Sequence, residues 1–225
     1  MAFALLLSVT TGVKAQSPTD LKKKYPKMAS IDEYLMNRDA EIALARSAAP
    51  ASISDGATVM VMGRGGYTTA VQGTNGFLCI VGRSWAKSTN DPEFWNPKLR
   101  SPNCFNAVAA KTVVQVYLTK TRLVLAGKSK AEIDQKLAAA LDHGEVPALE
   151  PGGMCYMMSK EQYLNDGAKS WYPHVMFFVA GDVPKSSWGA NLPSSPLIAA
   201  KDPDARVTVF MVVVRHWSDG TPGPS

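Results

Sequence analysis

Residues 57–83 read ATVMVMGRGGYTTAVQGTNGFLCIVGR, in which three short apolar runs are separated by two glycine-rich links. The runs are rich in residues that favour strands, and each link holds the glycines that tight hairpins need for positive φ. We therefore predict a meander of three strands joined by two hairpins. The strands are Ala57–Met62, Tyr67–Val71 and Phe77–Arg83, and the links are Gly63–Gly66 and Gly73–Gly76.

Helical patterns lie on both sides of these strands. Ser30–Glu33 has the spacing of a capping box, in which the Ser and Glu side chains satisfy each other's backbone donors, so we predict a helix from there to about Ser47. Residues 106–126 carry apolar side chains at helical spacing. Ser129–Glu132 is a second capping box, and its helix is expected to end at His143-Gly144.

The C-terminal half returns to strand patterns, and it completes the predicted fold class. Three further strands are expected at residues 154–159, 174–180 and 206–215, with irregular loops at 84–103 and 181–204. Strand runs with grouped helices between them indicate an α+β fold. We predict one domain over residues 30–217, in which an antiparallel sheet of about six strands accompanies an N-terminal helix and a central helix pair.

The first 15 residues have the features of a secretory signal peptide. Ala2–Val13 is an uncharged, mostly apolar run that is too short to span a bilayer, and the small residue Ala15 suits cleavage by signal peptidase. No Lys or Arg precedes the run, and Met28 offers an alternative start. We predict an exported, periplasmic or extracellular product with a flexible leader at 16–29, a disordered tail at 218–225 and no membrane anchor after cleavage.

The chain has three cysteines, an odd number that cannot pair completely within one molecule. An oxidising compartment favours one disulfide, and the intervening segment rich in Pro, Asn and Trp favours the pair Cys79–Cys104. Cys155 lies in the apolar run GGMCYMM, so it is expected to be an inert, buried thiol. The prediction requires Cα atoms of Cys79 and Cys104 to lie closer than about 7 Å.

Composition is that of a globular protein, with 46% apolar and 19% charged residues and a net charge of +5. A basic balance suits nucleic acid or an anionic surface, but the Lys and Arg residues are scattered and are not interleaved with aromatic residues. Together with export, this argues against a nucleic-acid partner. The histidines and cysteines lack the spacing of a metal site, and no cofactor motif is found, so neither a metal nor a cofactor is expected.

Two classes of function remain open at this point, and the sequence does not say whether the protein is an enzyme. The first is a non-enzymatic domain that binds a small molecule or a protein partner through the aromatic C-terminal third. The second is a periplasmic hydrolase with a site around His174, whose candidate partners are Ser159, Lys160 and Asp182. Ser159 and Lys160 are adjacent on a predicted strand and so point to opposite faces, which opposes a Ser–Lys dyad.

Several segments resemble exported bacterial proteins of unknown function. They are Met154–Lys160, Tyr163-Leu164, Trp171–Phe177, Asn96-Pro97 and Trp217–Pro222. The resemblance covers most of the chain that follows the signal peptide and implies a single exported domain. It implies no activity, cofactor or catalytic residue.

Overall fold

A computed structural model of the chain describes residue 20 and residues 24–224. The predicted signal peptide and half of the predicted leader lie outside the described residues. The strands are β1 (Thr58–Gly63), β2 (Gly66–Val71), β3 (Leu78–Gly82), β4 (Ser101–Phe105), β5 (Gly153–Met157), β6 (His174–Ala180), β7 (Leu197–Asp202) and β8 (Val207–Val213). The longer helices are α2 (Arg38–Arg46), α5 (Gln115–Leu125) and α6 (Lys130–Asp142). Short helical segments are η1 (Ile31–Glu33), α3 (Ala51–Ser54), η2 (Ser84–Ala86), α4 (Ala107–Ala109), η3 (Ala110–Val114) and η4 (Lys185–Trp188).

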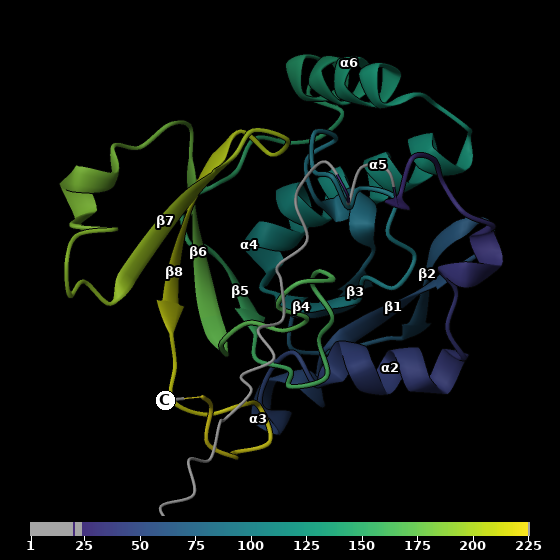
Figure 1. The fold of residues 1–225 in the computed structure, drawn as a ribbon. Coiled ribbons are helices and arrows are strands. Elements are labelled where there is room, and N and C mark those ends of the chain that lie inside the picture. Colours follow the sequence, from purple (N-terminus) through teal and green to yellow (C-terminus); the bar gives the residue numbers. More distant parts are fainter. Residues whose placement is uncertain (1–19, 21–23, 225) are drawn as a thin grey trace, which may run out of the picture.

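All eight strands form one sheet in the order β2-β1-β3-β4-β5-β6-β8-β7. The α+β class and the single domain are therefore confirmed, whereas the prediction of about six antiparallel strands is corrected in two respects. The sheet has eight strands, and it is mixed because β1 and β3 run parallel. The helices α4 and α5 cover one face, α2 and α3 lie on the other, and the strands β6, β8 and β7 extend beyond both (Figure 1).

The three predicted strands at 57–83 exist, but only their first link is a hairpin. Gly63 pairs with Gly66 at the turn between β1 and β2. The second link crosses beneath the start of β1 and delivers β3 to its other side. The crossing is close: a Cβ atom on Gly73 would lie 2.2 Å from the Thr58 backbone nitrogen. Glycine is required here for close approach of two backbone segments and not for a turn.

Of the two strands that the sequence analysis missed, β7 lies within a predicted loop and β4 begins in one. The strand β4 has the sequence SPNCF, and proline is rare inside a sheet because it cannot donate a ladder hydrogen bond. Pro102 and Val81 lie two residues from the close Cys79–Cys104 pair, so they form the same kind of cross-strand pair, in which neither residue donates to the other. On its other side β4 pairs with β5 only at Cys104 and Phe105, so no ladder hydrogen bond is required of Pro102. The strand β7 has only a short apolar run and directly follows a Pro/Ser-rich stretch, so the sequence pattern assigned it to a loop.

The ends predicted for the two central helices are confirmed, whereas the predicted start of the N-terminal helix is wrong. Ser129 and Glu132 form the predicted capping box of α6. Ser30 makes no side-chain cap, and only the single turn η1 follows it. The helix α2 begins after Asn37, whose side chain accepts from Asp39 N and Ala40 N. The break between the two places Tyr34 in the core, where its hydroxyl donates to the Trp95 carbonyl.

Both ends of the described chain pack against the domain. Lys24 and the Tyr25 hydroxyl bond the Asp166 carboxylate, within the segment for which the sequence predicts a flexible leader. In the predicted disordered tail, the Ser218 nitrogen donates to the Met158 carbonyl and Gly223 N donates to the Arg215 carbonyl. These contacts hold residues 24–29 and 218–224 close to the sheet.

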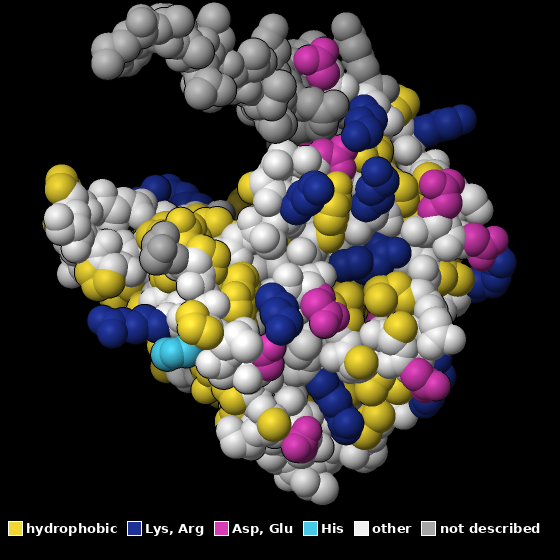
Figure 2. All heavy atoms as spheres, turned by 60° about the horizontal axis from the view of Figure 1, so that its bottom comes forward, with side chains coloured by type: hydrophobic (Ala, Val, Ile, Leu, Met, Phe, Trp, Pro, Cys, Tyr) yellow, Lys and Arg dark blue, Asp and Glu magenta, His cyan; other side chains and the backbone are white. Residues whose placement is uncertain are grey.

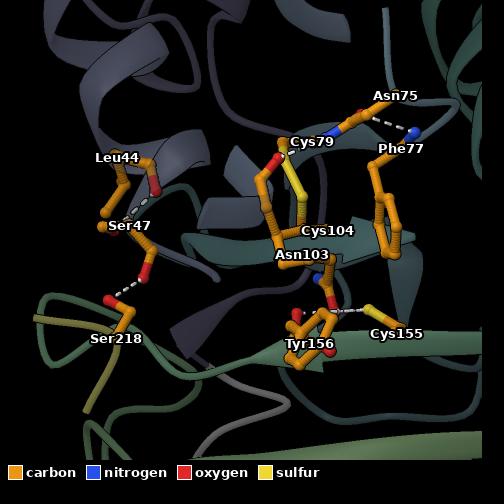
Figure 3. The surroundings of a disulfide bond; sticks show 11 residues. Leu44, Ser47, Asn75, Phe77, Cys79, Asn103, Cys104, Cys155, Tyr156 and Ser218 are labelled. Carbon is orange, nitrogen blue, oxygen red and sulfur yellow. Dashed lines mark hydrogen bonds between the residues drawn. A yellow bond between two sulfur atoms is a disulfide. The ribbon is translucent and has the colours of Figure 1, made fainter. Parts of the chain in front are cut away.

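The predicted disulfide between Cys79 and Cys104 is confirmed. The two residues face each other across β3 and β4, with Cα atoms 4.0 Å apart, and both side chains are fully buried (Figure 3). Cys155 is a buried free cysteine, as predicted, and burial raises the pKa of its thiol well above the ordinary value. The disulfide closes a loop that contains η2 and the irregular segment before β4.

We expect reduction of the disulfide to lower the free energy of unfolding by about 3 kcal/mol, because the open chain gains the entropy of a loop about 25 residues long. Urea unfolding with and without reductant measures the difference. The variant Cys155→Ala is the control, and it must show the same difference between its two redox states. An equal unfolding midpoint for oxidised and reduced protein would contradict the prediction.

Candidate functional site

His174 begins β6 and is buried, with only 2% of its surface exposed. Its Nδ1 donates to the Tyr172 carbonyl at 2.7 Å, and its ring meets the Trp171 indole edge to face at 4.6 Å between centroids. Burial lowers the pKa of His174, and the hydrogen bond to Tyr172 opposes that effect. The imidazole is thus held neutral between an aromatic ring and a backbone carbonyl.

The other residues proposed for a hydrolytic site have structural partners of their own. The Ser159 hydroxyl lies 2.7 Å from the Ser47 hydroxyl and accepts from the Glu161 nitrogen. The Lys160 ammonium pairs with Asp219, and the hydrogen bond from this lysine raises its pKa, which keeps it protonated. A protonated lysine cannot act as the base that a Ser–Lys dyad needs.

Asp182 lies at the opposite end of β6 from His174. The strand runs from His174 to Ala180, and at about 3.4 Å per residue this separates the two by about 20 Å or more. Asp182 pairs with Lys201 on β7. The structure therefore brings His174 and Ser159 to one end of the sheet, through the pairing of Met157 with His174, and leaves Asp182 at the other.

The aromatic residues of the C-terminal third do not line a common pocket. Phe178 packs against Phe105 on the face that α4 and α5 cover, while its neighbour Phe177 is 42% exposed on the opposite face. Trp188 stacks on Phe210 at the far end of the sheet, with centroids 4.3 Å apart. The Tyr163 hydroxyl donates to Asp166. Aromatic side chains that are close in sequence are thus divided between two faces and three clusters.

A pocket of about 270 Å³ lies instead where three segments meet: the loop after η2, the helix α6 and the turn between β7 and β8. Its lining combines polar and apolar side chains. The lining residues are Ser88, Thr89, Asn90, Asp134, Leu137, Ala138, Leu141, Pro203, Asp204 and Arg206. The volume lies below the range of about 300–1,000 Å³ that drug-sized ligands occupy, so the pocket suits a small molecule.

A buried lysine holds two of the three walls together. Lys120 on α5 is 0% exposed, donates to the Lys87 carbonyl at 2.6 Å and pairs with the Asp204 carboxylate. The remaining wall, α6, is joined to the loop after η2 by Thr89, whose hydroxyl donates to the Asp134 carboxylate at 2.7 and 2.9 Å. The turn itself is fixed by Asp202, whose carboxylate accepts from the Asp204 and Ala205 nitrogens. The pocket is therefore preformed.

The position of Lys120 carries a signal that the sequence analysis missed. Val116, Lys120 and Val124 follow one another at intervals of four, and all three are buried. Residues four apart share one face of a helix, so a lysine between two core valines is placed in the interior. A buried lysine needs an anionic partner, which the sequence alone does not place.

The described surface has further hollows, among them one of about 470 Å³ between α5 and α6. Among residues 20 and 24–224, no group of three or more His, Cys, Asp or Glu side chains could hold a metal ion. Within the same residues, none of the helices has the length and apolar content needed to cross a membrane. Figure 2 shows Lys and Arg side chains distributed singly among acidic and uncharged ones on the face it draws.

Comparison with known proteins adds no family to this description. No protein-family model matches the chain, and searches of curated proteins and of solved structures gave no significant match. The proposals below therefore depend on the geometry of the described residues.

We expect the stability of the protein to fall as the pH drops below about 6.5, the ordinary pKa of histidine. The unfolded chain takes up a proton there, whereas folded His174, whose pKa is lowered by burial, does not until the pH falls further. Urea unfolding between pH 8 and pH 5.5 measures this loss, and His174→Gln should reduce it. The exposed His216 provides the control His216→Gln, and an unchanged pH profile in His174→Gln would contradict the prediction.

Proposed function

We propose that the protein is an exported, non-enzymatic domain that binds a small polar molecule in the pocket between the Ser88–Asn90 loop, α6 and the β7–β8 turn. The observation that carries this proposal is the clamp by Lys120, which joins two walls through a fully buried ammonium group. Burying the Lys120 ammonium group costs free energy of desolvation, which its pairing with Asp204 offsets. A buried charge at this position is consistent with a requirement for fixed pocket walls. A preformed pocket loses little conformational entropy when a ligand binds.

Export is supported by two features of the chain. One is the apolar segment at residues 1–15, and the other is the Cys79–Cys104 disulfide, a bond that persists mainly in oxidising compartments. The pocket is not lined by the disulfide or by Cys155. Binding in it is therefore expected to be independent of thiol chemistry.

The hydrolase hypothesis has no specific geometric support. His174 bonds a backbone carbonyl, Ser159 bonds another serine, and Lys160 is paired with Asp219. A general base must lie within hydrogen-bond reach of the group from which it takes a proton, and no hydrogen bond joins these three side chains. The binding domain is the better account of the described residues.

The proposed function predicts that at least one small polar compound stabilises the protein through this pocket. At a concentration one hundred times its dissociation constant, a ligand adds about 2.7 kcal/mol to the free energy of unfolding. A thermal-shift screen of the purified protein identifies candidates, which are then tested on Ala138→Phe. The added ring fills the pocket that Ala138 lines, so the shift should be lost.

The neighbouring Ala139 provides a matched control, because it lines a different groove between α5 and α6. Ala139→Phe introduces the same ring on the same helix and should retain the ligand-induced shift. If every stabilising compound acts equally on both variants, the pocket is not the binding site and the proposal is wrong.

A further inference from the structure

The helix α6 presents one carboxylate and an apolar stripe to the pocket. Asp134, Leu137, Ala138 and Leu141 have the spacing i, i+3, i+4 and i+7, which places them along one face of the helix. Seven residues of helix span about 10 Å. The wall therefore has a negatively charged end and a longer apolar part.

The charges around the pocket are unequally compensated. Asp204 is neutralised by Lys120, and Arg206 Nη1 lies 2.7 Å from Asp142 Oδ1. Asp134 accepts only from the neutral Thr89 hydroxyl, and among the described residues no Lys, Arg or His forms an ion pair with it. The carboxylate available to a ligand is thus that of Asp134.

We propose that the pocket binds a small organic cation, namely a protonated primary amine with a compact apolar body. The ammonium group bonds the Asp134 carboxylate, Ser88 and Asn90 are further polar residues of the lining, and the apolar body packs along Leu137, Ala138 and Leu141. This inference rests on the proposed function and adds the class of ligand. Charge-assisted hydrogen bonds to a carboxylate are about twice as strong as neutral ones, which gives the amine its advantage.

Two other ligand classes fit the pocket less well. An anion meets the Asp134 carboxylate, and the one guanidinium in the lining, that of Arg206, is already paired with Asp142. A zwitterion such as an amino acid has to place its own carboxylate beside Arg206, whose charge is already shared with Asp142. A neutral alcohol of the same shape retains the apolar contacts and loses the charged one.

A matched series of four probes tests the inference: benzylamine, benzyl alcohol, benzoate and phenylglycine. They share a phenyl ring and differ in the charge of the attached group at neutral pH. Titration into the ¹⁵N-labelled full-length protein, followed by amide chemical shifts, measures each dissociation constant. We expect benzylamine to bind with a constant on the order of 1 mM, which suits so small a ligand, and at least fivefold more tightly than the other three.

The variant Asp134→Asn retains the shape of the side chain and removes its charge. Benzylamine should bind it at least fivefold more weakly, while benzyl alcohol should be little affected. Glu150→Gln makes the same change in net charge at a site outside the pocket, where Glu150 faces Lys111, and should leave both ligands unchanged.

Equal binding of benzylamine and benzyl alcohol, or equal binding of benzylamine to wild type and Asp134→Asn, would overturn the inference. So would tighter binding of benzoate or phenylglycine. If the thermal-shift screen finds a compound of another class that Ala138→Phe excludes, the proposed function stands and only the ligand class is wrong. If Ala138→Phe excludes no compound, both fail.

Discussion

The buried ion pair between Lys120 and Asp204 is the contact on which the pocket depends. Lys120 projects from α5, the helix that covers one face of the sheet, whereas Asp204 belongs to the turn at the far end of the β8–β7 hairpin. The same ammonium group donates to the Lys87 carbonyl, just after β3 and η2. One side chain thereby connects the helix-covered part of the sheet with the part that extends beyond the helices (Figure 1).

This connection explains how a small pocket is maintained at the junction of three segments that are distant in sequence. Leu137 of α6 and Ala205 of the turn belong to one buried apolar cluster. The Ser88–Asn90 loop carries no apolar side chain, and the polar contacts of Lys87 and Thr89 attach it to the rest of the pocket. Removing one partner of a buried ion pair typically costs about 3–5 kcal/mol, because the other charge is left unpaired. The pair therefore has more effect on the relative position of the walls than exposed pairs such as Lys201–Asp182, for which about 0–1 kcal/mol is usual.

Local patterns predicted much of the fold, and long-range contacts account for what they missed. The capping box at Ser129 and the six strands with short apolar runs depend on nearest neighbours in sequence, and the structure contains them. The strand β4 tolerates Pro102 because β5 pairs only with Cys104 and Phe105, and the helix predicted from Ser30 is interrupted where Tyr34 is buried. The parallel pairing of β1 and β3 depends on a crossing that only Gly73 permits.

The candidate site was less predictable than the fold, for the same reason. His174 and Ser159 were selected as isolated polar residues at strand ends, and their partners turned out to be a carbonyl and a second serine. The pocket residues Thr89, Asp134 and Asp204 come from three separate segments, so no sequence motif unites them. The one sequence signal for this site is the spacing by four of Val116, Lys120 and Val124, which places the lysine on the same helix face as two valines that are buried in the structure.

Hydrogen–deuterium exchange of the variant Lys120→Met measures whether Lys120 holds the pocket walls together. Met retains much of the length and apolar character of the lysine stem and removes the ammonium group. We predict that the amides of residues 87–90 and of residues 204–206 exchange at least tenfold faster in the variant, together, while those of α2 and β1 are unchanged. Unchanged exchange in both segments would contradict the claim that Lys120 holds the pocket walls together.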